Sequence, residues 1–378
     1  MNQPTKPTQT ENKRGGFSLR RVITAILCVS MAAVVMLTCT QCVKPASNDV
    51  KATEAATEAE TTAPEPTKPQ ADLTFETPNI PDDGSSGYTS ASDQGLYIYK
   101  NAAYELCGAS DEAGKDYAAA ISEFKKSAPD FTVYNMVVPT HTEFGIPQRL
   151  ASEIYTQSQS QNIKTIYSSY TEDVKPINCY NALCRHKDEY VYFNTDHHWT
   201  GLGAYYAYQA FCEQTGQQAL ALTDCTEQTI EGFEGSFYSA DASLSPDSVH
   251  YWKFPYQTHA KRQEESGAEM YDTDVYYEGA AGSGAYITFI YGDSSLFIEY
   301  NDTNKNGKKI AVVKESYGNA FVPYLTNNYE EVHIIDFRYF TQNIKEYMQE
   351  NGISEILFLN NTMSANAAMQ VDRIRELI

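Results

Sequence analysis

From residue 309 to its end, the chain alternates between short apolar runs and amphipathic segments. The apolar runs predict three strands, at residues 309–314, 332–337 and 355–360. The amphipathic segments predict three helices, at residues 319–325, 341–351 and 364–378. Strands separated by helices are typical of right-handed crossovers, so this region predicts a parallel sheet. In such sheets, functional side chains gather at the carboxyl ends of the strands.

The region before residue 220 continues this pattern. It predicts strands at residues 96–99, 131–138 and 190–194. It also predicts helices at residues 112–127 and 148–159, and one after Thr200, whose hydroxyl can cap the first turn. Residues 220–300 differ, because they are rich in Tyr, Gly, Ser and Asp. Apolar and polar residues alternate there only over short runs, at 274–277 and 286–291. We therefore expect an α/β domain over residues 94–378 that has a β-rich insertion with long loops at about 220–300.

The N-terminus resembles a targeting segment. Four basic residues, Lys13, Arg14, Arg20 and Arg21, precede an apolar run at 22–38 that can be extended to 43. As a helix, the run would span about 25 Å, or about 33 Å in its longer form. Basic residues on this side predict that the rest of the chain lies outside the cytoplasm. We expect residues 1–43 to be a cytoplasmic segment plus a membrane anchor.

Two alternatives to an uncleaved anchor remain open. One is cleavage as a long signal peptide. The other is lipidation at Cys39 or Cys42, although a lipidation site has a small residue before the cysteine, where this chain has Thr38 and Gln41. Beyond the anchor, residues 44–93 are rich in Thr, Ala, Glu, Pro and Ser and have almost no large apolar residues. They predict a flexible linker.

Composition and charge exclude some classes of partner. The formal net charge of −21 and the pI of about 4.7 argue against a nucleic-acid partner, which needs a basic face. Past residue 43 the cysteines are odd in number, so at least one is unpaired; they are Cys107, Cys179, Cys184, Cys212 and Cys225. One interpretation is that two disulfides form, 179–184 and 212–225. The alternative is that the cysteines are buried free thiols.

The first group of candidate catalytic residues is Asp196-His197-His198-Trp199, directly after the strand predicted at 190–194. In an extended segment, residues two apart face the same side, so Asp196 and His198 should pair while His197 points elsewhere. An aspartate beside an imidazole fixes its tautomer for acid–base chemistry. Adjacent histidines cannot easily chelate one ion and no metal-ligand spacing is present, so we expect no metal.

The second group follows the strand predicted at 309–314. A serine at a strand-to-helix junction, here Ser316, can present its hydroxyl at the edge of the sheet, or it can simply cap the helix. Asn360 ends the strand predicted at 355–360, where its amide could donate to an oxyanion. The sequence Gly292-Asp293-Ser294 looks like a nucleophile motif, but it lies in the insertion with no helix after it, so we predict a loop.

Two blocks, "YFNTDHHWTGLGAY" and "VVKESYGNAFVPYL…VHIIDFRYF", resemble the DHHW family of bacterial cell-envelope proteins. The resemblance extends from about residue 96 to the end of the chain. That family is similar to the SGNH-hydrolase-like domains of alginate O-acetyltransferases, which use an Asp-x-His-Trp motif and a downstream serine. The resemblance implies a flavodoxin-like three-layer sandwich. The chain departs from the pattern at Glu315, where Asp is usual, and at Gly318, where Ala is frequent.

The resemblance joins the two blocks into one site. It implies that Ser316 is the nucleophile, His198 its base and Asp196 the residue that orients the base, while Trp199 follows the motif. The backbone N–H of Tyr317, with Asn319 or Asn360, would then stabilise an oxyanion.

Such a site would form an acetyl-serine and transfer the acetyl group to a glycan or exopolysaccharide, or to water, without a cofactor. A membrane-bound acyltransferase would be a natural acyl donor by analogy with alginate acetylation. The alternative is a catalytically silent, glycan-binding or scaffold subunit of an envelope export system.

Overall fold

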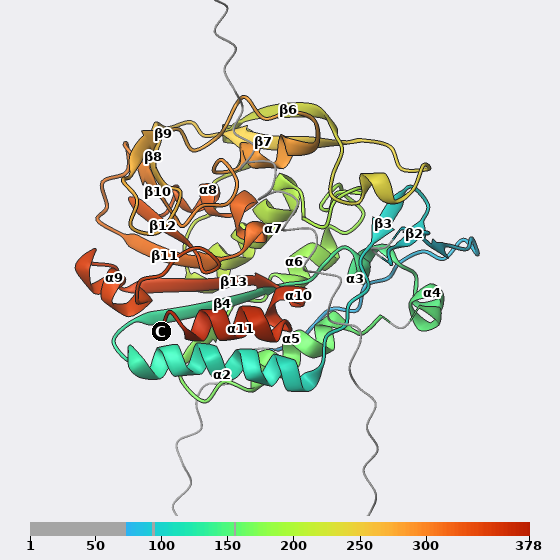
Figure 1. Cartoon of the computed structure of the whole chain (residues 1–378), viewed down its shortest axis with the longest axis horizontal. Helices are drawn as coiled ribbons and strands as arrows, with labels where there is room; N and C mark the ends of the chain where they lie inside the picture. The colour runs from blue at the N-terminus through green and yellow to red at the C-terminus, as the bar shows by residue number, and fades with distance from the viewer. Residues whose placement is uncertain (1–72, 93–94, 155) are drawn as a thin grey trace, which may run out of the picture. The chain divides into compact units, whose positions relative to one another are not determined.

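One large sheet forms the centre of the folded region (Figure 1). The computed structural model describes residues 73–92, 95–154 and 156–378, so the predicted anchor and most of the predicted linker lie outside the described residues. Within them, eight strands pair in the order β5-β4-β13-β11-β12-β10-β8-β9. Their bounds are Val174–Pro176, Thr132–Val138, Glu355–Asn361, Lys309–Lys314, Glu331–Asp336, Leu296–Asn301, Thr258–Gln263 and Tyr271–Thr273, in that order. Neighbours are parallel from β5 to β12 and antiparallel from β12 to β9.

Helices cover both faces of this sheet. On one face lies α2 (Asp111–Ser127), where Phe124 contacts Phe358 of β13 with ring centroids 5.2 Å apart. On the other lies α7 (Gly201–Thr215), where Phe211 contacts Tyr134 of β4 at 5.5 Å. The helices α5 (Gln159–Ser168), α10 (Thr362–Ala365) and α11 (Ala368–Arg375) accompany α2, while α6 (Tyr180–Arg185) and α8 (Val322–Leu325) accompany α7. The predicted α/β sandwich with a mostly parallel sheet is confirmed.

Smaller elements lie outside the sheet. A three-stranded antiparallel sheet contains β1 (Tyr88–Thr89), β2 (Tyr97–Tyr99) and β3 (Ala102–Tyr104). The short helices α3 (Thr142–Gly145) and α4 (Gln148–Glu153) follow β4, and α9 (Ile344–Glu350) follows β12. Residues 73–92 fall within the predicted linker, yet β1 pairs with β2 and the Glu76 carboxylate accepts a 2.7 Å hydrogen bond from Arg185.

The predicted elements agree best with the structure in the last 70 residues, where β11, β12 and β13 match the three predicted strands. The helix predicted at 148–159 is wrong, because α4 ends at Glu153 and a new helix, α5, begins at Gln159 after its cap Ser158. The strand predicted at 190–194 is also wrong, since only Tyr192 makes an isolated bridge, to Trp199. Its backbone is held instead by the Asp247 carboxylate, which accepts from the N–H groups of Asn194 and Thr195.

The predicted insertion contributes to the main sheet as well as to loops. Strands β8, β9 and β10 extend that sheet, whereas β6 (Thr226–Phe233) and β7 (Asp247–Lys253) form a separate antiparallel pair. The alternating run at 286–291 is not a strand, because most of it lies in or beside the 3-10 helix η3 (Gly282–Thr288). The other 3-10 helices are η1 (Leu222–Asp224), η2 (Tyr238–Ala240) and η4 (Ser316–Ala320).

The five cysteines of the described region are free thiols, and neither of the two considered disulfides is formed. All are buried except Cys225, which is partly exposed. Burial raises the pKa of Cys179 and of Cys212 to about 12, so these thiols stay protonated and unreactive. Among the described residues, no helix has both the length and the apolar character that a membrane span requires.

The carboxyl group of Glu299 in β10 is buried without a partner. Glu299 has no exposed surface, and neither carboxylate oxygen has a hydrogen-bond partner among the described residues. Burial therefore raises the pKa of Glu299 well above its ordinary value of 4.5, since a charge there would lose its hydration. The folded protein keeps this proton at pH values at which the unfolded chain has lost it.

We predict that Glu299→Gln stabilises the protein more at pH 8 than at pH 4. Above about pH 4.5 the unfolded wild-type chain binds fewer protons than the folded protein, so the wild-type free energy of unfolding falls as pH rises. The slope for one proton is at most about 1.4 kcal/mol per pH unit. Glutamine keeps the shape but removes this dependence. Urea unfolding across the pH range tests this, and parallel stability curves for the two proteins would contradict it.

Candidate active site

The two predicted blocks meet at the carboxyl end of β11. Ser316 is the first residue of η4, directly after the strand, and Asp196 and His198 precede α7. The start of α7 is fixed by Thr200, whose hydroxyl accepts from Gly203 N and donates to the carbonyl oxygen of Tyr190. Local capping chemistry therefore holds the histidine segment beside the serine.

The structure brings Asp196, His198 and Ser316 into one hydrogen-bonded chain. The His198 Nδ1 atom lies 2.6 Å from Asp196 Oδ1, and its Nε2 atom lies 2.8 Å from Ser316 Oγ. Because a carboxylate only accepts, Nδ1 carries the proton and Nε2 has the free lone pair. The Ser316 hydroxyl can then donate to Nε2, which is the arrangement of a general base facing its nucleophile.

The Asp196 carboxylate is buried and fully engaged. Its Oδ1 atom also accepts from His198 N at 3.0 Å, and Oδ2 accepts from Ser236 N at 2.8 Å. Burial alone would raise the pKa of Asp196, but the imidazoles of His197 and His198 and the hydrogen bonds outweigh it and hold the pKa well below its ordinary value. Asp196 is therefore ionised when it orients His198.

Trp199 connects the two blocks. Its indole Nε1–H donates a 2.8 Å hydrogen bond to the carbonyl oxygen of Tyr317, and its side chain is completely buried. The Tyr317 hydroxyl in turn donates to the carbonyl oxygen of His197. These reciprocal contacts fix the distance between the base and the nucleophile.

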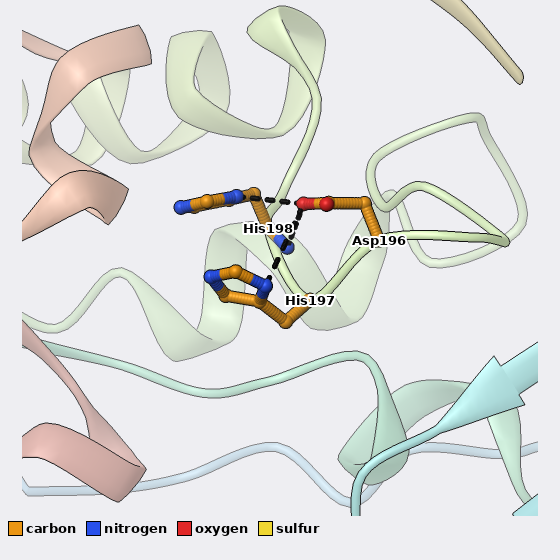
Figure 2. Close-up of side chains that lie close together, drawn as sticks. All are labelled: Asp196, His197 and His198. Atoms are coloured by element: carbon orange, nitrogen blue, oxygen red, sulfur yellow. Dashed lines mark hydrogen bonds and ion pairs between the residues drawn. The ribbon is translucent and has the colours of Figure 1, made fainter. Parts of the chain in front are cut away.

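His197 does not point away from the pair, which corrects the alternation argument. Residues 195–198 form a bend rather than an extended strand, so residues next to each other can face the same side. Figure 2 shows both imidazoles near the Asp196 carboxylate: His197 Nδ1 lies 3.8 Å from Oδ1, and the two ring centroids are 3.9 Å apart. Atoms of Asp196, His197 and His198 that could bind a metal all lie within 4.8 Å of one another. Two histidines that are neighbours in sequence can therefore face the same metal ion here.

Tyr286 is a residue of the site that the sequence patterns missed. Its ring stacks on His198 with centroids 4.0 Å apart and planes inclined by 14°, and its hydroxyl donates to the Ser316 carbonyl oxygen at 3.0 Å. Tyr286 belongs to η3 in the insertion, far from both motifs in sequence. The insertion therefore supplies one wall of the site.

The expected oxyanion donors are arranged differently from the prediction. The N–H of Tyr317 donates to Glu315 Oε2 at 2.8 Å, so it is not free. Asn319 Nδ2 donates one hydrogen to Asp293 Oδ1 at 3.1 Å. Asn360 accepts from the Tyr117 hydroxyl at 2.8 Å, while its Nδ2 has no partner among the described residues. The Asn side chains retain donor hydrogens, but the Tyr317 amide would need Glu315 to move.

Glu315 ties the nucleophile turn to the neighbouring strand. Its Oε1 atom accepts from both N and Nδ2 of Asn361 in β13, and Oε2 lies 3.5 Å from Ser316 Oγ. The Glu315 side chain therefore reaches from this turn to β13. Burial raises the pKa of Glu315 above its ordinary value.

A partly buried ionic cluster supports the same turn. Lys314 Nζ lies 3.0 Å from Asp336 Oδ2 and 3.5 Å from Asp293 Oδ1, and Arg338 pairs with both aspartates. Asp293 belongs to the Gly-Asp-Ser segment that was predicted to be a plain loop. Burial alone would raise the pKa of Asp293, but Lys314 and Arg338 hold it well below its ordinary value.

The chain is similar to a known protein family and to several solved structures. A family model described as "DHHW protein" matches residues 71–335. A solved DHHW family protein from Eubacterium siraeum is 31% identical, with a TM-score of 0.69 over 77% of this chain and 98% of that chain. Two structures of Bacillus cereus PatB1, one of them with a sulfonyl adduct, are 21% identical, with TM-scores of 0.60 and 0.59 over 73% and 75% of this chain and 98% and 99% of theirs. The chain shares its α/β fold with these solved structures. No relative was found among curated protein sequences.

We predict that Gly235→Ala slows labelling of Ser316 by a sulfonyl fluoride about 10- to 100-fold. A Cβ at position 235 would lie 2.4 Å from the Thr195 carbonyl oxygen and 2.5 Å from Asp196 Cβ, so Asp196 would have to move. Gly108→Ala is the control, because nothing lies within 4 Å of its added Cβ. Mass spectrometry of the labelled serine over time gives the rates, and equal rates in both variants would contradict this role of Gly235.

Proposed function

The chain belongs to the DHHW protein family, and we propose that it is a serine-dependent O-acetyltransferase or acetylesterase that acts on a polysaccharide outside the cytoplasm. The observation that carries the proposal is the continuous chain of hydrogen bonds from Asp196 through His198 to Ser316. It contains a nucleophile, a base and a group that orients the base, which is the set that acyl transfer requires.

The reaction would proceed in two steps. In the first, His198 Nε2 removes the Ser316 proton while Oγ attacks the acyl carbon of a donor ester. The bond between that carbon and the donor oxygen breaks, and the leaving oxygen takes the proton from His198, so that Ser316 carries the acetyl group. In the second, His198 removes the proton of a sugar hydroxyl or of water while that oxygen attacks the acetyl carbon. The bond between this carbon and Ser316 Oγ breaks, and His198 returns the proton to Oγ.

Each surrounding residue has a physical role in these steps. The ionised Asp196 stabilises the imidazolium that forms on His198. The ring of Tyr286 covers one face of His198 and limits its rotation. Asn319 and Asn360 each carry an amide hydrogen without a partner among the described residues, and either could donate to the oxyanion.

A glycan acceptor is supported by the predicted location and by the family resemblance. The basic and apolar residues at the N-terminus predict a single-pass protein whose folded domain lies outside the cytoplasm, tethered by the linker. A hydroxyl-rich polymer of the cell envelope is the acceptor class available there. A membrane-bound acyltransferase would be the partner that brings acetyl groups to this side of the membrane.

We predict that Ser316→Ala and His198→Ala each lower acetyl transfer from 4-nitrophenyl acetate at least about 10³-fold, and that the double variant is no worse. Both residues act in one step, so their losses do not add. The expected acetyl-enzyme is detected on Ser316 by mass spectrometry after a short reaction.

Ser294→Ala, which removes a buried hydroxyl outside the hydrogen-bonded chain, is the matched control and should keep most of its turnover. Adding oligosaccharides to the same assay separates transfer to sugar from hydrolysis. Unchanged turnover in Ser316→Ala would leave a silent, glycan-binding subunit as the better description.

The proposed location is tested separately by protease treatment of intact cells. We expect the protease to remove the domain from the cell surface, because residues 44–378 would lie outside the membrane. Protection of the domain while a known outer protein is cut would show the opposite orientation.

A further inference from the structure

Asp196, His197 and His198 together present the ligand set of a transition-metal site (Figure 2). We propose that they bind Zn²⁺ reversibly and that bound Zn²⁺ inactivates the catalytic base. The binding itself stands on the geometry of the three side chains. Its effect on catalysis rests on the proposed function.

The three ligand atoms are already near the positions that Zn²⁺ requires. Carboxylate oxygen and imidazole nitrogen bind Zn²⁺ at about 2.0–2.2 Å, so ligands in a tetrahedron lie about 3.4 Å apart. The Asp196 Oδ1 atom lies 2.6 Å from His198 Nδ1 and 3.8 Å from His197 Nδ1. To bind Zn²⁺, the Asp196–His198 distance must lengthen and the Asp196–His197 distance must shorten, each by less than about 1 Å. Side-chain rotation alone supplies such movements.

The site offers both an entry route and room for a fourth ligand. The His197 side chain is 36% exposed, whereas those of Asp196 and His198 are 6–7% exposed, so an ion would reach the cluster from the His197 side. A cavity of about 10 Å³ adjoins the cluster and is lined by Glu105, His141, Asp196 and His197. That volume is close to what one water molecule needs, and water is the usual fourth ligand at a three-residue zinc site.

The contacts around His197 also suit a ligand. Its Nδ1 atom lies 2.9 Å from the Ser236 hydroxyl, which can rotate away or hydrogen-bond to bound water. The same Ser236 holds Asp196 through its backbone N–H, so the carboxylate keeps one support when Oδ1 turns to the metal. Hydrogen bonds of this kind orient metal ligands.

Zinc at Nδ1 would change which ring nitrogen of His198 carries the proton. In the free protein, Nδ1–H donates to Asp196 and the Nε2 lone pair accepts from Ser316. A neutral imidazole has one proton and one free lone pair. When Nδ1 gives its lone pair to Zn²⁺, the proton must leave Nδ1 and the ring must carry one on Nε2. His198 can then only donate to Ser316, and it no longer accepts the serine proton.

The experiment compares the purified full-length protein with His197→Gln and His259→Gln. His197 neither carries the acyl group nor accepts the Ser316 proton in the proposed reaction, so His197→Gln removes a metal ligand and keeps the nucleophile and its base. The labelling rate of each protein with Zn²⁺ is compared with its own rate without Zn²⁺. His259→Gln removes an exposed histidine that pairs with Asp302 at 2.9 Å, and it controls for surface sites. Titration with ZnCl₂ by calorimetry and with Co²⁺ by visible absorption measures binding, and sulfonyl-fluoride labelling of Ser316 measures the state of the base.

We expect the wild type and His259→Gln to bind Zn²⁺ with equal affinity, and His197→Gln to bind at least about tenfold more weakly. Zn²⁺ should block labelling of Ser316 in the wild type and in His259→Gln. It should leave the labelling rate of His197→Gln unchanged. Equal affinity for Zn²⁺ in the wild type and in His197→Gln would contradict the proposed metal site. Tight binding of Zn²⁺ that leaves Ser316 labelling unchanged would contradict the proposal that zinc inactivates His198. Because binding is measured without turnover, the site can stand even if acetyl transfer is never observed.

Discussion

The Asp196 carboxylate is the group on which the site depends, because it joins three separate parts of the chain. It orients His198 before α7, it is held by the backbone N–H of Ser236 from the insertion, and through His198 it reaches Ser316 after β11. A buried carboxylate is stable only if its charge is compensated by donors. The insertion therefore supplies one of the donors that compensate the charge of the carboxylate beside His198.

The parts of the fold that sequence patterns predicted are those governed by local periodicity. Strands β11, β12 and β13 are buried on both faces and read as continuous apolar runs. Ser316 could be placed because it lies just past the end of β11. The pairing of Asp196 with His198 was predicted too, although for the wrong reason, since residues 195–198 bend instead of alternating. That same bend turns His197 toward the carboxylate.

What sequence patterns missed is held by contacts between distant residues. Tyr286 contacts His198 although 88 positions separate them in the chain. Asp247 accepts a hydrogen bond from the backbone N–H of Asn194, at the end of the segment predicted to be a strand. Asp293 looked like part of a plain loop, yet its charge is balanced by Lys314 and Arg338. No local rule connects such residues, because burial and charge compensation are properties of the assembled fold.

The unpaired, mostly buried cysteines have a consequence for the conditions under which the domain can fold. A domain whose core holds thiols and no disulfide does not need an oxidant or an isomerase to reach its native state. Its stability should be the same in reducing and oxidising surroundings. The folded domain should therefore be obtainable in native form from the reducing interior of a bacterial expression host.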